Sequence, residues 1–229
     1  MKTLIIVPAY NESLNIQKTI HDITSNTNFD YIIINDSSKD NTLEVCKKNN
    51  FKVLTLPANF GLTSAIQLGM KYAHIHNYDI AIQFDGDGQH KAIYLQSLVD
   101  AIQYENCDIV IGSRFVSIKR PTSLRMLGSI LISFAIRCVK GKIIKDPTSG
   151  MRAYNKKVIE EFSINSSLTP EPDTLVYFLK KGYHVKEVQV EMDEREHGES
   201  YLNFSKSIEY MMNMFLMIIF IRGITRGRK

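Results

Sequence analysis

The residues best suited to chemistry lie in one short stretch, FDGDGQH, from Phe84 to His90. Asp85 and Asp87 stand two residues apart at the end of an apolar run, and each is followed by a glycine. Two carboxylates at positions i and i+2 of a strand point the same way, and hard oxygen ligands suit Mg²⁺ or Mn²⁺. Few protein oxygens usually hold such a cation, and substrate phosphates complete its shell. The stretch therefore predicts a divalent-metal site that takes a phosphate-bearing substrate.

The elements that must position this site are short apolar runs alternating with helix-like segments. The expected strands are 3–8, 29–36, 51–57, 78–85 and 108–113, and the expected helices are 13–25, 38–49, 62–76 and about 95–104. This alternation predicts an α/β fold with a mainly parallel sheet covered by helices on both faces. Right-handed crossovers bring the carboxyl ends of parallel strands to one edge, where such sheets bind ligands.

Polar residues follow all five expected strands. The stretches are PAYNE (8–12), NDSS (35–38), NFG (59–61), DGDGQH (85–90) and GSR (112–114). Any one of them is compatible with an ordinary turn or helix cap, because Asp, Asn, Ser and Gly favour such places. Five of them at a single edge predict a binding site that includes Arg114.

The composition and the absence of two motifs exclude several classes of protein. The net charge of +4 over 229 residues is too mild to indicate nucleic acid, and three scattered cysteines fit a reducing compartment without a metal cluster. No G-x-x-x-x-G-K-[ST] loop and no G-x-G-x-x-G turn occurs, which argues against a P-loop NTPase and a dinucleotide-binding domain. The opening MKTLIIVPAY lacks the pattern of a secretory signal, so we expect a cytoplasmic protein.

Taken together, the motifs resemble those of the family-two glycosyltransferases of the GT-A fold. The resemblance is to the branch with dolichyl-phosphate mannose synthase and the bacterial polyprenyl-phosphate sugar transferases. It rests on motifs in the family's order: VPAYNE (7–12), INDSSKDNT (34–42), NFG (59–61), DGDGQH (85–90), DIVIGSR (108–114), DPTSGMRAY (146–154) and REHGES (195–200). The resemblance implies a nucleotide-sugar donor, Mg²⁺ or Mn²⁺, and a lipid-phosphate or glycan acceptor.

The resemblance also implies roles for individual residues. Those expected to bind the nucleotide sugar are Pro8, Tyr10, Glu12, Asp36, Asp85, Arg114, Arg125, Ser129, Arg195 and Ser200, with Arg125 paired to Ser129. Those expected to meet the metal are Asp85, Asp87 and Gln89. Two motifs depart from the family: Asn35, Asp36 and Ser37 stand where it usually has two acids and a glycine, and Tyr201 replaces a common basic residue.

The acceptor decides whether a general base is needed. A lipid phosphate is already ionised at neutral pH, whereas a sugar hydroxyl must lose its proton as the bond forms. Asp146 is the first candidate for the base, and Asp173 and Glu171 are further candidates. The alternative for Glu171 and Asp173 is a helix start around Pro172, and for Asp146 a turn before Pro147. The expected catalytic residues are therefore Asp146, Asp87, Asp173 and Arg114.

The end of the sequence is strongly apolar. The run from Ile208 to Ile221 is shorter than the ~20 residues that span a bilayer, and the basic RGITRGRK follows it. It is either a core or dimer helix, or an in-plane anchor on anionic lipid, and the run 124–139 also suits a membrane surface. We expect a catalytic domain at 1–205 and an apolar, basic helix at 206–229, with the protein peripheral at the inner face of the cell membrane.

The sequence thus predicts an inverting, metal-dependent glycosyltransferase that acts in cell-envelope polysaccharide synthesis. Its preferred acceptor is a polyprenyl phosphate or a lipid-linked glycan. The alternatives are transfer to a soluble or protein-linked glycan, an inactive nucleotide-binding homologue and, less favoured, a nucleotidyltransferase. The latter typically has a glycine-rich basic loop after its first strand, where this chain has PAYNES.

Overall fold

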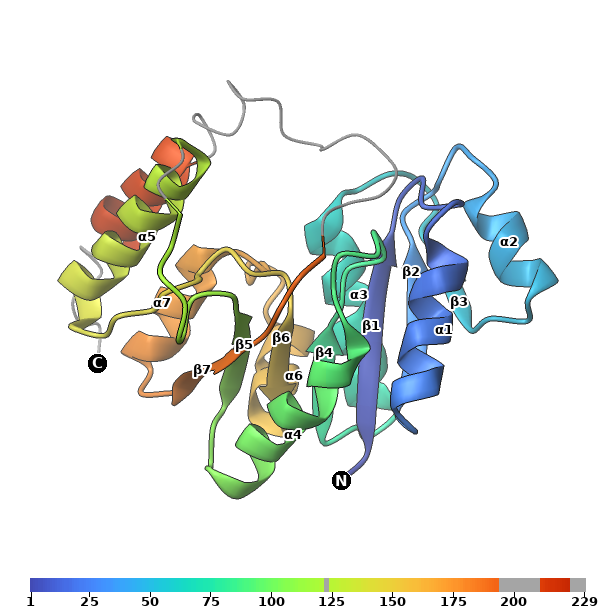
Figure 1. Ribbon diagram of the computed structural model, residues 1–229, viewed down its shortest axis with the longest axis horizontal. Coiled ribbons are helices and arrows are strands. Elements are labelled where there is room, and N and C mark those ends of the chain that lie inside the picture. The colour runs from blue at the N-terminus through green and yellow to red at the C-terminus, as the bar shows by residue number, and fades with distance from the viewer. Residues whose placement is uncertain (122–123, 194–210, 223–229) are drawn as a thin grey trace.

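One seven-stranded sheet organises the part of the chain that the computed structural model describes, residues 1–121, 124–193 and 211–222 (Figure 1). Its order is β3-β2-β1-β4-β6-β5-β7. The strands are β1 (Thr3–Ala9), β2 (Asp30–Asn35), β3 (Val53–Thr55), β4 (Ile80–Gln83), β5 (Ile109–Ser113), β6 (Arg152–Asn155) and β7 (Val185–Gln189). The five strands expected from the sequence are confirmed, and β6 and β7 are additional.

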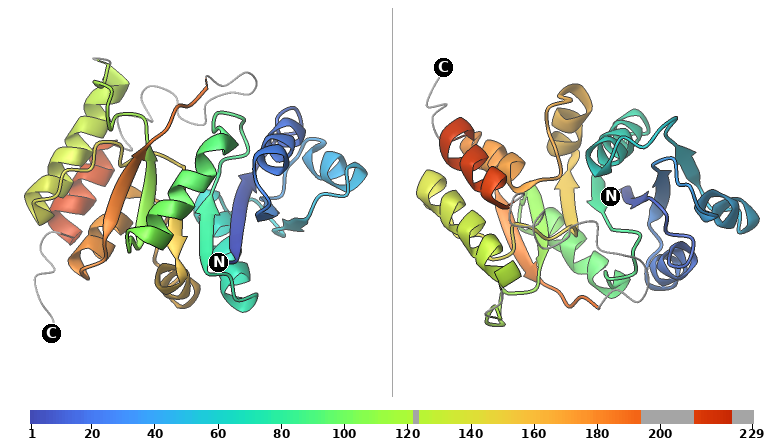
Figure 2. Two further views of the ribbon diagram at one scale, coloured as in Figure 1. Left: turned by 60° about the horizontal axis from the view of Figure 1, so that its bottom comes forward. Right: turned by 90° about the horizontal axis from the view of Figure 1, so that it is seen from above.

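Helices cover both faces of this sheet (Figure 2). They are α1 (Ile16–Asn26), α2 (Thr42–Lys48), α3 (Leu62–Ile75), α4 (Leu95–Tyr104), α5 (Leu124–Lys140), α6 (Lys156–Ile164) and α7 (Pro172–Lys180). The side chains of β1 alternate between the two layers: Leu4 and Ile6 pack with α3, while Ile5 and Val7 pack with α1. A strand buried on both faces must be apolar throughout, which explains the unbroken run TLIIVP.

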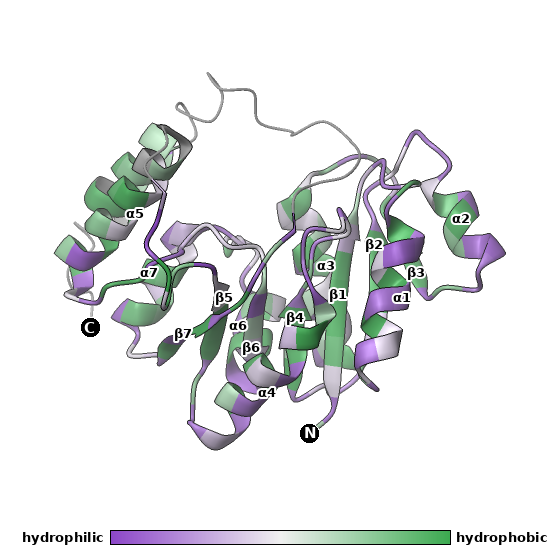
Figure 3. Ribbon diagram, in the orientation of Figure 1, coloured by the Kyte–Doolittle hydropathy of each residue, from purple (hydrophilic) through white to green (hydrophobic). Residues whose placement is uncertain are grey.

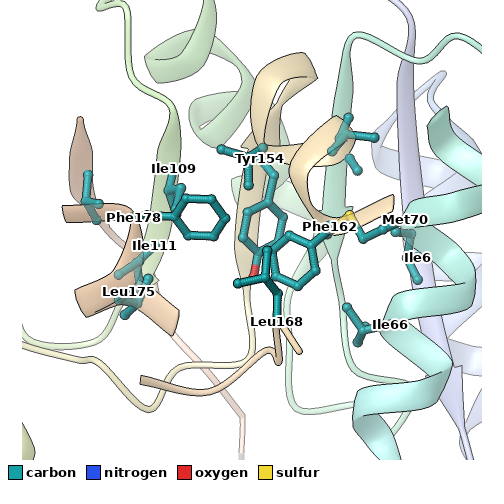
Figure 4. Packing of buried hydrophobic residues seen from close by; sticks show 14 of the residues in the cluster. Ile6, Ile66, Met70, Ile109, Ile111, Tyr154, Phe162, Leu168, Leu175 and Phe178 are labelled. Atoms are coloured by element: carbon teal, nitrogen blue, oxygen red, sulfur yellow. The ribbon is translucent and has the colours of Figure 1, made fainter. Parts of the chain in front are cut away.

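An aromatic cluster fills the larger layer, between the sheet and helices α3, α6 and α7 (Figure 4). Tyr154 of β6 meets Phe162 of α6 edge-on at 5.6 Å between ring centroids, and Phe162 lies 5.9 Å from Phe178 of α7. Such edge-on and tilted pairs add to the stabilisation from burial alone. The cluster fixes α6 and α7 against β6, and so fixes the segments that lead into and out of that strand.

β6 runs against the direction of every other strand. It pairs antiparallel with both β4 and β5, while the remaining pairs are parallel. Because its direction is reversed, the residues that precede β6 reach the edge where the other strands end. The loop 146–151 therefore joins the polar residues that follow β1, β2, β4 and β5.

The C-terminal segment packs on the rest of the molecule over the residues that are described. Residues 211–216 are helical and continue into a π-helix over Met217–Arg222, beside α5 and α7 (Figure 1). Met214 and Ile218 are buried in the core, and a Cβ on Gly128 of α5 would collide with Met211. The proposed domain boundary after residue 205 lies outside the described residues, so that division stays a prediction. No helix in the described parts of the chain is long and apolar enough to cross a bilayer.

This packing predicts that the C-terminal segment contributes to stability. Ile218 is 0% exposed, whereas Leu216 is 42% exposed. Ile218→Ala should lower the free energy of unfolding by about 2–4 kcal/mol, because it leaves a cavity in the core. Leu216→Ala, the matched control, should change it by less than about 0.5 kcal/mol. Urea unfolding followed by circular dichroism measures both free energies of unfolding. If Ile218→Ala lowered stability as little as the control does, the segment would lie on the surface without supporting the fold.

Candidate active site

Asp85 and Asp87 lie in a turn directly after β4, at the edge where the strands end. β4 stops at Gln83, so the two carboxylates are not on a strand, and the argument from side-chain alternation was wrong for them. The Gln89 N–H instead donates to Asp87 Oδ1 at 3.1 Å, and Gly88 adopts a φ of +77°, which glycine takes without strain. The turn, and not strand geometry, positions the pair.

Gly150 and His90 lie against Asp85 and hold it in place. A Cβ on Gly150 would lie 2.1 Å from Asp85 Oδ2, so any side chain at this position would displace the carboxylate from its place. The Asp85 N–H donates to His90 Nδ1 at 3.1 Å, and the His90 ring stacks edge-on against Phe84. His90 is therefore a buried support for the turn, a role that the sequence did not assign. Within the described residues, no three His, Cys, Asp or Glu side chains gather closely enough to enclose a metal on their own.

Gln89 links the turn to the segment after β7. Its backbone N–H donates to Asp87 Oδ1, as described above. Its backbone carbonyl accepts from the Asp193 N–H at 2.9 Å, and its side-chain amide nitrogen lies 3.4 Å from the Asp193 carbonyl. Lys91 adds ion pairs to Glu191 and Asp193. The chain that leads away from β7 is thus fastened to the turn that carries Asp85 and Asp87.

Asp36 follows β2 and clamps the start of α3. Its two carboxylate oxygens accept from the N–H groups of Phe60 and Gly61 at 2.8 and 2.7 Å. Gly61 is the N-cap of α3, so the carboxylate lies where the positive end of the helix dipole favours it. The side chain is buried at the edge, next to the turn after β1, where the Asp36 N–H donates to the Ala9 carbonyl.

The departure from the family at residues 35–37 has a local structural explanation. The side-chain oxygen Oδ1 of Asn35 accepts from the Ser38 N–H at 3.2 Å, and its side-chain nitrogen Nδ2 lies 3.4 Å from Thr55 Oγ1 of β3. Ser37 adopts a φ of +56°, the left-handed region that glycine reaches without cost. The backbone therefore keeps the conformation that suits a glycine, although the residue is serine.

The turn after β1 holds the other residues expected to bind the nucleotide. Pro8 lies in β1, Tyr10 follows it half-buried, and the Glu12 N–H donates to Thr42 Oγ1 at 2.9 Å. Glu12 also accepts from Asn15 at 2.7 Å. These contacts bring the turns after β1 and β2 together, as the sequence predicted, and leave Tyr10 at the surface of the edge.

Arg114 and Asp146 form a two-pronged ion pair beside this edge. Arg114 Nε and Nη2 donate to the two oxygens of Asp146 at 2.8 and 2.9 Å, and the Arg114 N–H adds a third bond at 3.1 Å. Asp146 raises the pKa of the Arg114 guanidinium, mainly through these hydrogen bonds. The Asp146 side chain is fully buried, whereas Arg114 is one-third exposed. The pair presents a guanidinium toward solvent and keeps its carboxylate inside.

Side chains of β7 hold both partners of that pair, and the sequence did not point to them. Glu187 accepts from the N–H groups of Lys145 and Asp146, both at 2.7 Å. Gln189 donates to the Arg114 carbonyl at 3.0 Å and accepts from the Ser117 N–H at 2.9 Å. Half-buried polar residues that alternate along an edge strand were the only signal for them.

Arg152 binds the loop 146–151 to the loop before α7. It is 2% exposed, and its guanidinium donates to the carbonyls of Pro147, Ser149 and Pro170 at 2.6–2.9 Å. A buried cation needs such partners, because burial without them is costly. One side chain therefore fixes the loop of Asp146 relative to the loop before α7.

Asp173 lies in the first turn of α7, which begins at Pro172 with Glu171 as its N-cap. The helix-start interpretation of these acids is confirmed. Asp173 is buried and accepts from Thr169 Oγ1 at 3.3 Å. A catalytic role for it stays a prediction.

Three expected phosphate-binding residues cannot be placed. Arg195 and Ser200 lie outside the described residues, as does Tyr201. Arg125 belongs to the first turn of α5, but its side chain is not among those described. Ser129 is described: its hydroxyl is buried and has no hydrogen-bond partner among the described residues.

The sequence is similar to those of two polyprenyl-phosphate sugar transferases. The chain is 30% identical to dolichol-phosphate mannosyltransferase of Pyrococcus furiosus, over 95% of this chain and 64% of that protein. It is 28% identical to undecaprenyl-phosphate mannosyltransferase of Micrococcus luteus, over 87% of each. These relatives belong to the branch that the motifs indicated.

Solved structures confirm the fold. Glucosyl-3-phosphoglycerate synthase from Mycobacterium tuberculosis, solved with Mn²⁺, UDP and phosphoglyceric acid, superposes with a TM-score of 0.72. The match covers 99% of this chain and 80% of that one at 13% identity. The expected GT-A fold is thereby confirmed.

The family itself follows from a direct match. The family model described as Glycosyl transferase family 2 matches residues 4–163, which include the turns after β1, β2, β4 and β5 and the Arg114–Asp146 pair. This match covers well over half of the sequence. The chain belongs to glycosyl transferase family 2 and is a glycosyltransferase.

Proposed function

We propose that the protein transfers a sugar, with inversion, from a nucleotide sugar to a polyprenyl phosphate or lipid-linked glycan in cell-envelope polysaccharide synthesis. The observation that carries the proposal is the contact between Asp85 and Gly150. It joins the turn expected to hold the donor diphosphate to the loop whose Asp146 orients Arg114. The names of the relatives, which use dolichol and undecaprenyl phosphates, support the acceptor.

The residues present fit a divalent metal. Asp85 and Asp87 supply hard oxygen ligands in one half-buried turn, and a cation completed by substrate phosphates needs no third acid. Asp85, Asp87 and Gln89 would hold Mg²⁺ or Mn²⁺, which would neutralise charge on the departing nucleoside diphosphate. Pro8, Tyr10, Glu12 and Asp36 would contact the base and ribose, and Arg114 would meet phosphate.

Asp146 acts in this proposal by orienting Arg114. Both of its oxygens already accept from the guanidinium, and the side chain has no exposure to solvent. A phosphate acceptor is a nucleophile without losing a proton, so no general base is required. The planar guanidinium, fixed by the carboxylate, is preorganised for phosphate oxygens. Attack from the face opposite to the diphosphate then inverts the anomeric centre in one displacement.

The surface of α5 supports a position at the inner face of the membrane. Ile130, Leu131 and Phe134 are exposed on this helix, and the adjacent C-terminal segment exposes Met212 and Leu216. Much of the α5 ribbon is hydrophobic in character (Figure 3). Arg137 and Lys140 follow in the last turn of α5. An apolar helix face with basic residues at its end is typical of in-plane binding to anionic lipid.

The metal proposal predicts a loss of turnover when Asp87 is changed. Asp87→Ala should lower kcat by at least about 100-fold, because transition-state charge is no longer neutralised. It should leave the protein folded and lower the melting temperature without ligand only slightly, because the hydrogen bond from the Gln89 N–H is lost. Asp100→Ala on α4 is the matched control and should keep full activity. Two assays measure these effects: turnover of the nucleotide sugar, and thermal stabilisation by nucleoside diphosphates. Each is run with EDTA and with added Mn²⁺ or Mg²⁺. Full activity in excess EDTA would reject a metal.

The role of Asp146 predicts a particular pH profile. Asp146→Asn keeps one acceptor oxygen but removes the charge that fixes Arg114, so kcat/KM should fall by about 10- to 100-fold. The shape of the pH–rate profile should be unchanged, because no proton transfer is lost. If Asp146 is a general base, the fall in rate at acidic pH that the wild-type profile shows should be absent from the profile of the variant. Steady-state kinetics from pH 5 to 9 distinguish the two roles.

The membrane proposal predicts that α5 governs vesicle binding. Ile130→Ser with Phe134→Ser should weaken binding to phosphatidylglycerol-containing vesicles by at least about tenfold, through loss of buried apolar area. The matched control is Ile75→Ser with Ile164→Ser, two residues exposed on α3 and α6. Co-sedimentation measures the bound fraction. A similar loss in both pairs would contradict a specific role for α5.

A further inference from the structure

Gln83, the last residue of β4, is a polar side chain buried beneath the turn that carries Asp85. The strand is otherwise apolar, from Ile80 to Ile82, and Gln83 itself is 1% exposed. Its side-chain Nε2 donates to Asp85 Oδ1 at 3.4 Å, while its Oε1 has no hydrogen-bond partner among the described residues. Gln83 lies outside every motif, yet its amide is directed at the first carboxylate of the expected metal site.

Tyr154 of β6 places a second polar atom without a partner on the same face of the sheet. β4 and β6 are neighbours, and their register pairs Gln83 with Arg152 and Ala81 with Tyr154. Gln83 and Tyr154 are therefore diagonal neighbours, a spacing at which long side chains meet. The Tyr154 hydroxyl is buried without a hydrogen-bond partner in the described parts of the chain, and it points toward Leu168 (Figure 4).

Charge and hydrogen-bonding capacity connect the Tyr154 hydroxyl to the turn above it. Burial raises the pKa of the hydroxyl, the Arg152 guanidinium lowers it, and the Asp85 carboxylate raises it further. Tyr154 carries an O–H donor and Gln83 Oε1 is an acceptor, so the two unpartnered groups are complementary.

Neither polar group is explained by packing. Both lie in a layer filled mainly with apolar side chains, where an unpaired polar group lowers stability. Methionine at position 83 and phenylalanine at position 154 would fill nearly the same space without that cost. The amide and the hydroxyl therefore call for a role other than stabilisation of the core.

We propose that Gln83 is a positioning residue, which holds the Asp85 carboxylate in the orientation that a divalent cation needs, and that Tyr154 acts through it. A small rotation of the Gln83 amide lets Oε1 accept from the Tyr154 O–H while Nε2 still donates to Asp85 Oδ1. The carboxylate is then held from inside the sheet. The Asp85 side chain is 31% exposed, so its outer side stays open. This role rests on the proposed function, because the cation belongs to the donor site proposed above.

Mn²⁺ is titrated into the purified protein at a fixed concentration of UDP or GDP, and thermal stabilisation is followed. In Gln83→Met the Mn²⁺ concentration at half-maximal stabilisation should rise by about 10- to 100-fold, the usual effect of losing a group that orients a metal ligand. The melting temperature without ligand should be unchanged or higher, because methionine leaves no unpaired amide oxygen. Stabilisation by each nucleotide in EDTA should match that of the wild type. A purely structural role would instead lower the melting temperature and leave the Mn²⁺ midpoint unchanged.

Tyr154→Phe and the double variant test the link between the two side chains. Tyr154→Phe should raise the Mn²⁺ midpoint by about fivefold, the effect of one neutral hydrogen bond. The double variant should be shifted no further than Gln83→Met alone, because the hydroxyl acts only through the amide.

Gln67→Met on α3 is the matched control. Gln67 is also a buried glutamine whose Oε1 has no partner among the described residues. Its Nε2 donates to the carbonyls of Asn165 and Leu168 at 3.2 and 2.6 Å. The loss of these two bonds should lower the melting temperature and leave the Mn²⁺ midpoint unchanged.

Each outcome has a defined meaning. An unchanged Mn²⁺ midpoint in Gln83→Met would overturn the positioning role, as would an equal shift in Gln67→Met. Additive shifts in the double variant would overturn the action of Tyr154 through Gln83. A wild-type protein that Mn²⁺ does not stabilise with either nucleotide would reject the proposed function and the positioning role with it. A normal wild-type response without an effect of Gln83→Met would reject the positioning role alone.

Discussion

The loop from Asp146 to Gly150 is the constraint on which the site depends. It is held by the buried Arg152 through the carbonyls of Pro147 and Ser149, by Glu187 through the Asp146 N–H, and by Ser149 Oγ, which donates to the Gly112 carbonyl at 2.6 Å. One end of the loop orients Arg114, and the other supports Asp85. The proposed reaction requires the donor and the acceptor to be held at a fixed separation. In that proposal this short loop, anchored on three sides, sets the separation.

The reversed direction of β6 explains why this loop can serve both sides. If β6 were parallel to the other strands, the loop before it would lie at the opposite edge of the sheet. Because β6 is antiparallel, the connection from β5 through α5 ends at the edge where β5 also ends, and the DPTSGM segment lies there. Arg152, the first residue of β6, is then placed directly under the loop that it holds.

The sequence was sufficient to predict those strands and turns whose local residue pattern matches their place in the fold. The apolar runs of β1, β2, β4 and β5 are buried on both faces, so their composition alone identified them, and the polar turns after them meet at one edge. β6 and β7 were missed because RAYN and VKEVQ carry polar residues, whose hydrogen bonds are visible only across the sheet. Glu187 and Gln189 were missed for the same reason, because the backbone groups of Asp146 and Arg114 that they bind are distant in sequence. The partners of Arg152, the carbonyls of Pro147, Ser149 and Pro170, converge only when the chain folds. Asp146 was recognised as central, but its pairing with Arg114 could not be read from spacing.

The clamp that Asp36 places on α3 has a consequence for the evolution and engineering of donor choice. The carboxylate that is expected to read the nucleotide also neutralises the N–H groups of Phe60 and Gly61 at the start of a core helix. A substitution that alters base preference at this position would release that helix end, with a cost of about 1 kcal/mol or more. New donor specificity is therefore accessible mainly through its neighbours, such as Asn35, Ser37 and Tyr10. Asp36 itself is restrained by the fold as well as by the substrate.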